Sequence, residues 1–361
     1  MPRPPLTAIA FVIAVAPAAG VATPLSYLRT YGPAADPITT LGWGLGLIAS
    51  FVCAIVGVLL LAGIFRTRPE SLDAEGRPVL QRDTGGMRFV YAGVGISAIV
   101  LFGATVWTLT TLSAVAAVPN TVAAGIHVIG HQWWWEVHYP DQGFTTANEV
   151  HIPVGQPVLF KLTTADVIHS FWAPQLQAKM DLLPGQTNTT WLTADRPGVY
   201  QVECAEYCGL QHAHMQLLIV AEAQDQVNAW MANEKKPAAV TAPTLKVTAV
   251  APSVPNAAAK KPTAEAPTDP LLVQGQQIYF GSACVYCHMI RGTISTGQIG
   301  PDLTHIASRR TLGSGMLENN TGNLSGWIIN AQAIKPGNRM PPMYLDAGSL
   351  HALVAYLQSL K

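Results

Sequence analysis

The sequence has little charge. Asp, Glu, Lys and Arg together make up 12% of its 361 residues, the formal net charge is zero, and apolar residues reach 49%. This balance is too apolar for an ordinary soluble protein of this length, so we expect a membrane-embedded portion. No lysine and arginine cluster with interleaved aromatic residues occurs. Its absence argues against a nucleic-acid partner.

Long apolar runs occur near the N-terminus. Residues 1–23 combine one early arginine with a short apolar run and small residues, which predicts a signal peptide; a retained membrane anchor is the alternative. Within residues 24–118, the runs 41–65 and 89–118 contain no charged residue and predict a transmembrane helical hairpin. The stretch between the runs is rich in arginine, so the positive-inside rule places it in the cytoplasm and the rest of the chain outside. These arginines are Arg66, Arg68, Arg77, Arg82 and Arg88.

The texture changes after the second run. From residue 119 to 232, short alternating runs bounded by Gly, Pro, Asn and Asp predict an all-β sandwich or barrel. Residues 233–268 are rich in Pro, Ala and Lys and predict a flexible linker. Residues 269–361 show helical periodicity at both ends and predict an all-α domain. The fold class is therefore a multidomain membrane protein with one domain of each kind.

The last domain contains the stretch CVYCH, with Cys284, Cys287 and His288. C-x-x-C-H is the attachment pattern of c-type haem, in which two thiols bind the haem vinyl groups and the histidine becomes the proximal iron ligand. A redox or zinc pair beside an unrelated histidine is the alternative. A zinc site would need further ligands, and the segment holds no other cysteine.

Residues 269–361 resemble class I cytochromes c over their whole length. GQQIYFGSACVYCH resembles the first helix of that family, with Gly275 at its crossing with the last helix. IGPDL resembles the loop beside the proximal histidine, and KPGNRMPPM resembles the distal loop. The resemblance implies that Met340 is the distal haem ligand, and Met343 is the alternative.

The stretch CAEYCGLQHAHM, residues 204–215, concentrates metal-binding side chains. It holds Cys204, Cys208, His212 and Met215, and His169 lies in an earlier segment. In an oxidising compartment, a disulfide between the two cysteines is one interpretation. Thiolate, imidazole and thioether together form a copper ligand set, but one thiolate exceeds what a mononuclear blue copper site uses. Two thiolates could instead bridge two copper ions.

HSFWAP together with CAEYCGLQHAHM resembles the dinuclear copper centre, CuA, in subunit II of haem–copper cytochrome c oxidases. The domain order resembles that of caa-type oxidases, whose subunit II carries a fused C-terminal cytochrome c and whose outer β domain is cupredoxin-like with Greek-key topology. The resemblance implies that the two cysteines bridge two coppers and that the other ligands are His169, His212, Met215 and the Glu206 main-chain carbonyl. His214 competes with His212. The Glu206 carboxylate would hold magnesium shared with subunit I.

The same resemblance implies roles for further residues. Trp133, in GHQWWWEVHY, matches the surface tryptophan that passes electrons inward, whereas Trp134 and Trp135 are expected in the core. Asp166 lies where the family has an acidic residue, with a solvated loop residue as the alternative. The family's acidic residue near the start of the second helix is missing, so either proton uptake enters elsewhere than through this subunit, or the acid is Glu75 or Asp83 in the preceding loop.

The function that the resemblance implies is electron input to a terminal oxidase. Electrons would pass from cytochrome c or another periplasmic donor through haem c and the copper centre to subunit I, where oxygen is reduced to water with coupled proton translocation. Subunit I, subunit III and the bacterial inner membrane are the expected partners, with both redox domains on the periplasmic side. The rival hypotheses are a nitrous oxide reductase-like enzyme and a membrane-anchored redox carrier or sensor.

Overall fold

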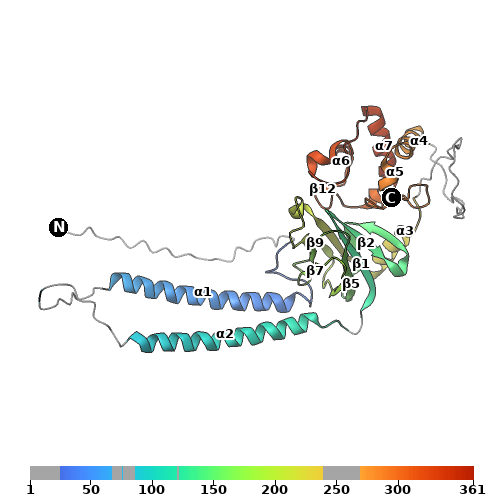
Figure 1. The fold of residues 1–361 in the computed structure, drawn as a ribbon. Coiled ribbons are helices and arrows are strands. Elements are labelled where there is room, and N and C mark those ends of the chain that lie inside the picture. The colour runs from blue at the N-terminus through green and yellow to red at the C-terminus, as the bar shows by residue number, and fades with distance from the viewer. Residues whose placement is uncertain (1–24, 67–74, 76–85, 120–121, 239–268) are drawn as a thin grey trace.

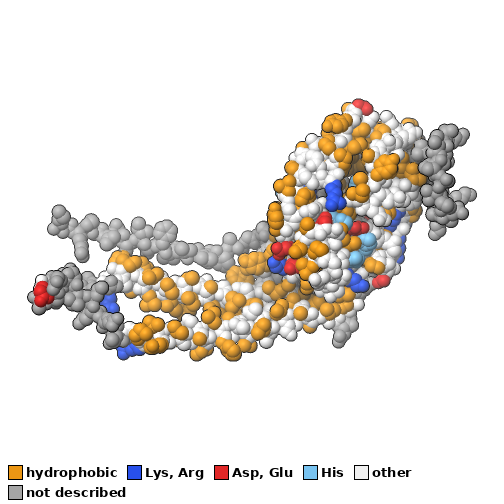
Figure 2. All heavy atoms as spheres, in the orientation of Figure 1, with side chains coloured by type: hydrophobic (Ala, Val, Ile, Leu, Met, Phe, Trp, Pro, Cys, Tyr) orange, Lys and Arg blue, Asp and Glu red, His pale blue; other side chains and the backbone are white. Residues whose placement is uncertain are grey.

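A computed structural model describes residues 25–66, 75, 86–119, 122–238 and 269–361. The predicted signal peptide, Asp83 and most of the predicted linker lie outside these ranges. Two long helices, α1 (Asp36–Phe65) and α2 (Met87–Ala116), lie side by side (Figure 1). Each is long and apolar enough to cross a membrane, and Figure 2 shows hydrophobic side chains along both. The helices confirm the predicted hairpin, although α1 starts before residue 41 because a proline in its first turn favours helix initiation.

The hairpin is attached to the next domain at one end. Gly44 allows close helix packing, since a Cβ atom there would lie 2.2 Å from Cη2 of Trp107. Ahead of α1, the Tyr31 N–H donates to the carbonyl of Gln175 at 2.8 Å. At the end of α2, the Trp191 indole donates to the carbonyl of Val115 at 3.2 Å. The start of α1 and the end of α2, which lie at the same end of the helix pair, are therefore both bonded to the β-sandwich.

The second domain is a sandwich of two five-stranded sheets, with orders β3-β2-β1-β5-β8 and β4-β10-β9-β6-β7. Neighbouring strands are antiparallel except for the pairs β1–β5 and β4–β10. The strands are β1 (Ala123–His131), β2 (Trp134–Tyr139), β3 (Phe144–Ala147), β4 (Glu149–Pro153), β5 (Val158–Thr164), β6 (His169–Trp172), β7 (Met180–Leu182), β8 (Asn188–Leu192), β9 (Gly198–Cys204) and β10 (Gln216–Glu222). Helix α3 (Gln224–Glu234) follows the last strand, and the 3-10 turns η2 (Pro140–Gln142) and η3 (His212–His214) lie in loops.

Alternation along the strands builds the core of the sandwich. Strand β2 alternates between half-buried and fully buried residues, as expected when one face meets a core. The buried side chains from both sheets form one cluster, which includes Trp135, Phe160, Leu162, Phe171 and Leu182. Met215 and both cysteines of the 204–215 stretch belong to this cluster, so the core itself holds the candidate metal ligands.

The C-terminal domain is helical and confirms the predicted fold class. Its helices are α4 (Pro270–Gly281), α5 (Cys284–Cys287), α6 (Thr321–Ile334) and α7 (Ala347–Ser359), with the turn η4 (Ile306–Ser308) and a small hairpin of β11 (Thr311–Leu312) and β12 (Leu317–Glu318). The side chains of Asp269, Asn320 and Asp346 cap the starts of α4, α6 and α7. At Gly275 a Cβ atom would lie 1.9 Å from the carbonyl oxygen of Ala352, so the crossing of α4 and α7 requires glycine.

The C-terminal domain rests on the β-sandwich (Figure 1). Gln216 N–H donates to the Ser314 carbonyl at 3.0 Å, and the Ser314 hydroxyl donates to the Gln216 carbonyl at 2.7 Å. The predicted linker was expected to begin at 233, but α3 continues to Glu234, and the Ala238 N–H then donates to the Arg291 carbonyl at 3.2 Å. Composition alone missed these residues because they are held by tertiary contacts.

Candidate metal centre

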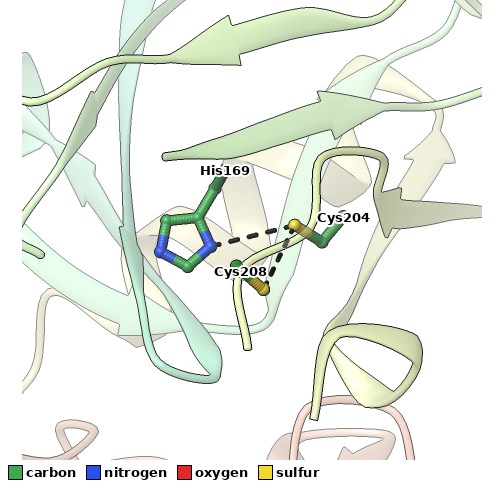
Figure 3. Close-up of side chains that lie close together, drawn as sticks. All are labelled: His169, Cys204 and Cys208. Carbon is green, nitrogen blue, oxygen red and sulfur yellow. Dashed lines mark hydrogen bonds between the residues drawn. The ribbon is translucent and has the colours of Figure 1, made fainter. Parts of the chain in front are cut away.

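The cysteines and histidines of the predicted copper site lie together at one end of the sandwich. Cys204 ends β9, Cys208 lies in the following loop, and His169 begins β6. The two sulfur atoms are 3.6 Å apart, and Nδ1 of His169 lies 3.8 Å from the Cys204 sulfur (Figure 3). Nδ1 of His212 lies 3.7 Å from the Cys208 sulfur. Each sulfur therefore faces one imidazole, in an arrangement that is nearly symmetric about the sulfur pair.

Two further donors complete the group. The Met215 sulfur lies 3.9 Å from the Cys208 sulfur, and the Glu206 carbonyl oxygen lies 3.2 Å from the Cys204 sulfur. The Glu206 side chain is exposed. His214 turns elsewhere, because its Nδ1 pairs with the Gln211 amide oxygen at 2.8 Å. Geometry thus favours His212 over His214 as a ligand.

The spacing of these atoms fits metal ions placed between them. Thiolate and imidazole bind zinc-like ions at about 2.0–2.3 Å, so two such ligands at a tetrahedral angle are about 3.6 Å apart. A disulfide requires about 2.05 Å between sulfurs, and both cysteines are free thiols. The donor set, two thiolates with imidazoles and a thioether, is soft and suits copper.

The two thiols have pKa values shifted in opposite directions. The neighbouring Cys208 sulfur and the His169 ring lower the pKa of Cys204. The same neighbour, with burial, raises the pKa of Cys208, because two adjacent thiolates repel each other. Bound metal ions would stabilise both cysteines as thiolates.

Asp166 orients His169. One carboxylate oxygen of Asp166 lies 2.8 Å from Nε2 of His169 and accepts the Val167 N–H at 2.7 Å. The other oxygen accepts the Gln132 N–H at 2.7 Å. Burial alone raises the pKa of Asp166, but these hydrogen bonds hold it below its usual value. With Nε2–H donated to Asp166, the Nδ1 lone pair of His169 points at the sulfur pair.

A second site is a cavity in the C-terminal domain. Its lining includes the cysteines and histidine of the C-x-x-C-H pattern, together with Met340 and Met343. The His288 ring is held by a hydrogen bond between Nδ1 and the Pro301 carbonyl at 2.8 Å, which leaves Nε2 free for a metal. Burial lowers the pKa of His288 and so favours the neutral form that binds iron. At Gly300 a Cβ atom would lie 2.7 Å from Cε1 of His288, so only glycine fits against this ring.

Met340 and Met343 both line this cavity. The Met340 backbone is braced on both sides: its N–H donates to the Asn338 side chain at 2.7 Å, and its carbonyl accepts the Gln332 side chain at 2.8 Å. The Met343 N–H donates to the Ile329 carbonyl at 3.0 Å. Met340 remains the predicted ligand on its position in the loop.

Trp133 connects the two sites. Its indole N–H donates to the Cys208 carbonyl at 3.0 Å, and its side chain lines the cavity of the C-terminal domain. Trp134 lines the same cavity and stacks on His131 at a ring-centroid distance of 4.4 Å, so the expectation that it packs in the core is wrong. Trp135 is fully buried, as expected. Trp133 therefore contacts both the cavity and the main chain of the sulfur site.

The sequence did not single out Lys335, which lies at this junction. Its side chain is buried, and its ammonium donates to the carbonyls of Trp133, His214 and Gly313. The first two carbonyls belong to the sandwich and the third to the C-terminal domain. Nothing in the local pattern around residue 335 signals this contact, because its partners lie far away in the chain.

Together, the fold and the two sites define a membrane-anchored redox protein with a thiolate-rich metal domain and a c-type haem domain. Comparisons with known proteins agree. Residues 143–223 match the family described as cytochrome c oxidase subunit II, periplasmic domain, and residues 272–361 match the cytochrome c family. The chain thus carries the periplasmic domain of cytochrome c oxidase subunit II followed by a cytochrome c domain. These two families imply a copper centre and a covalent haem.

Individual relatives are described as cytochrome c oxidase subunit 2. The chain is 41% identical over 244 residues to cytochrome c oxidase subunit 2 of Alkalihalophilus pseudofirmus, a match covering 67% of this chain and 62% of that protein. It is 32% identical over 253 residues to cytochrome c oxidase subunit 2 of Bacillus sp. PS3, covering 67% and 63%. The chain therefore spans less than two thirds of these relatives. Among solved structures, the periplasmic domain of cytochrome oxidase subunit II of Bradyrhizobium japonicum is 32% identical, with a TM-score of 0.32, and covers 33% of this chain and 97% of that one.

Proposed function

We propose that this chain is subunit II of a terminal haem–copper oxidase and that it brings electrons into the complex. Cytochrome c or another periplasmic donor would deliver an electron to the covalent haem, the dinuclear copper centre would receive it next, and subunit I would use it to reduce oxygen to water with coupled proton translocation. Subunit III is a further proposed partner. Magnesium is proposed at the Glu206 carboxylate, on the side facing subunit I.

The single observation that carries this proposal is the position of Trp133. Its indole lines the cavity that holds Cys284, Cys287 and His288, and the same indole donates a hydrogen bond to the main chain of Cys208. When bound, the haem and the copper pair supply one-electron redox chemistry. The protein supplies a short, packed connection between them, which a chance pairing of two unrelated domains would not provide.

The residues of the chain would hold each group and exclude competing chemistry. Cys204 and Cys208 are proposed to bridge two copper ions, with His169 and His212 each binding one. Met215 and the Glu206 carbonyl would complete the ligand shell. In the other domain, Cys284 and Cys287 would anchor the haem, with His288 and Met340 as axial ligands. Because donors surround both sites, oxygen has no open position, and the chain acts as a relay.

The proposed orientation places both redox domains outside a bacterial inner membrane. Arg66 caps the end of α1 and Arg88 lies in the first turn of α2. Positive charge at these two ends favours the cytoplasmic side. The β-sandwich is bonded to the opposite end of the helix pair.

The rival functions receive less support. A nitrous oxide reductase-like enzyme needs a histidine-rich catalytic cluster, and this chain has ten histidines in all. His131, His138 and His151, which have no proposed metal role, pair with glutamates of the sandwich. A free-standing redox carrier would share the relay geometry. Purification with or without a haem–copper partner separates this second rival from the oxidase.

The decisive experiment is the electron paramagnetic resonance spectrum of the full copper-loaded chain, with total copper counted. We expect a hyperfine pattern from one unpaired electron shared by two copper nuclei. Cys204→Ser should abolish that pattern, because one bridge is lost, whereas Cys53→Ser should leave it intact, since Cys53 lies exposed on α1. A single-copper pattern in the unchanged protein, or a Cys204–Cys208 disulfide without copper, would contradict the proposal.

A further inference from the structure

Lys335 is a buried cation at the junction of two domains. It follows the last residue of α6, and its relative exposure is 2%. Its ammonium forms no ion pair with any carboxylate in the described part of the chain. Burying an ammonium without a counter-ion is costly, so such a residue is expected only where its hydrogen bonds are fully used.

All three donors of the Lys335 ammonium are used, and each reaches a different segment. The acceptors are the carbonyls of Trp133 at 2.8 Å, His214 at 2.6 Å and Gly313 at 2.8 Å. Burial lowers the pKa of this ammonium to about 7, whereas three carbonyl oxygens around it favour the charged form. One side chain therefore ties the C-terminal domain to two strand ends of the sandwich.

Both segments of the sandwich that Lys335 holds adjoin the sulfur site. The Trp133 indole contacts the Cys208 main chain, and His214 directly precedes Met215. On the other side, the Lys335 carbonyl accepts the Asn338 side chain at 2.6 Å, and Asn338 in turn accepts the N–H of Met340. Lys335 is thus bonded, through very few intermediates, to the candidate ligand loops of both sites.

Other hydrogen bonds cross the same interface. The Gln211 amide donates to the Pro336 carbonyl at 2.8 Å, and the Arg310 N–H donates to the Glu149 carboxylate at 3.0 Å. Each of these is a single hydrogen bond, whereas the Lys335 ammonium donates to three carbonyls from two domains. Loss of the ammonium would leave those three carbonyls without this donor, and their unsatisfied hydrogen bonds would weaken the docking of the two domains.

We propose that Lys335 is a positioning residue that locks the haem domain onto the copper domain in the orientation that directs the haem cavity at Trp133. This inference rests on the proposed electron relay. Lys335 lines the cavity proposed for the haem, but its ammonium bonds to three main-chain carbonyls and to none of the proposed ligand atoms. It acts by fixing the distance and orientation between the two sites, on which the rate of electron transfer depends.

The test compares Lys335→Met with the unchanged full chain in detergent. The first readout is hydrogen exchange at residues 133–135 and 214–216, which reports docking without any metal. The second is the rate at which an electron placed on the haem by a light-triggered reductant reaches the copper centre. We expect faster exchange at both segments and a transfer rate lower by at least about tenfold. Haem absorption and the copper resonance should stay unchanged.

Two control variants separate docking from charge and from general interface damage. Lys361→Met removes the same charge from an exposed position of the same domain and should leave both readouts unchanged. Ser314→Ala removes one neutral hydrogen bond to the Gln216 carbonyl across the same interface and should have a smaller effect than Lys335→Met. Lys335→Arg retains the charge but not the compact three-donor geometry, so it should fall between Lys335→Met and the unchanged chain.

The outcomes distinguish this inference from the proposed function. If the unchanged chain transfers electrons from haem to copper and Lys335→Met matches it in both readouts, the positioning role is wrong. If the unchanged chain shows no such transfer, the relay itself is wrong. Should Lys335→Met fail to bind haem or copper, Lys335→Arg decides: unchanged exchange and unchanged transfer in a fully loaded protein would overturn the inference.

Discussion

Removing the carboxylate of Asp166 should weaken copper binding while leaving every proposed ligand in place. Asp166 accepts three N–H donors: one oxygen faces His169 at 2.8 Å and Val167 at 2.7 Å, and the other accepts the Gln132 N–H at 2.7 Å. Partners of this kind, behind a ligating histidine, typically contribute about 10–100-fold to metal affinity, or about 1.4–2.7 kcal/mol. Asp166→Ala removes both acceptor oxygens and all three hydrogen bonds, so we expect a loss near the upper figure.

Asp166→Asn should fall near the lower figure, about tenfold. Its single oxygen can still accept from His169 and Val167, but the amide nitrogen then faces the Gln132 N–H, donor against donor. The assay is a competition titration of the full chain against a copper chelator, followed by the copper resonance. Asp141→Asn, at an exposed acid in η2, is the matched control and should leave affinity unchanged. If Asp166→Ala binds copper within about twofold of the unchanged chain, Asp166 does not position His169.

Two further predictions concern stability. Gly275→Ala should lower the melting temperature of the haem domain, because its Cβ would lie 1.9 Å from the Ala352 carbonyl oxygen; overpacking of about 1–3 kcal/mol outweighs a helix-propensity gain of about 1 kcal/mol. Gly281→Ala, in the same helix with open space around it, should not lower it, and equal melting of the two variants would refute the clash. Burial raises the pKa of Glu136, but hydrogen bonds to two histidines outweigh this effect and lower the pKa from 4.5 to about 2. The unfolded chain therefore binds the proton first as pH falls, and stability should drop between pH 4.5 and 2; Glu136→Gln should flatten this part of a denaturation-midpoint profile, and an unchanged slope would contradict the assignment.

Local patterns predicted most of the fold and most candidate ligands. The haem pattern depends on spacing within five residues, from Cys284 to His288, which any structure of this segment preserves. The apolar runs predicted both long helices because a membrane span needs only length and hydropathy. The 204–215 stretch brings four donor side chains and the Glu206 carbonyl together within twelve residues, so only His169 had to be supplied from another strand.

The contacts between domains could not be read from such patterns. Lys335 bonds to Trp133, about two hundred positions earlier in the chain, and a basic residue after an apolar helix looks like a solvated helix end. The error at Trp134 has a simpler reason. Neighbouring residues on a strand point to opposite faces, so Trp134 and Trp135 cannot both enter the core of the sandwich. Strand alternation predicts that one of these two tryptophans faces outward, but it does not say which one.

The backbone around the sulfur pair is held by hydrogen bonds of the sandwich. The Cys204 N–H donates to the Met215 carbonyl at 3.1 Å, and the Ala205 N–H donates to the Ser170 carbonyl at 2.9 Å. These bonds join three strands beneath the donors, so the ligand positions exist before copper arrives. Ions that change oxidation state among donors held in this way can shift little. In the proposed relay, such a scaffold would keep the reorganisation energy of the copper centre small, so that electrons would cross it under a small driving force.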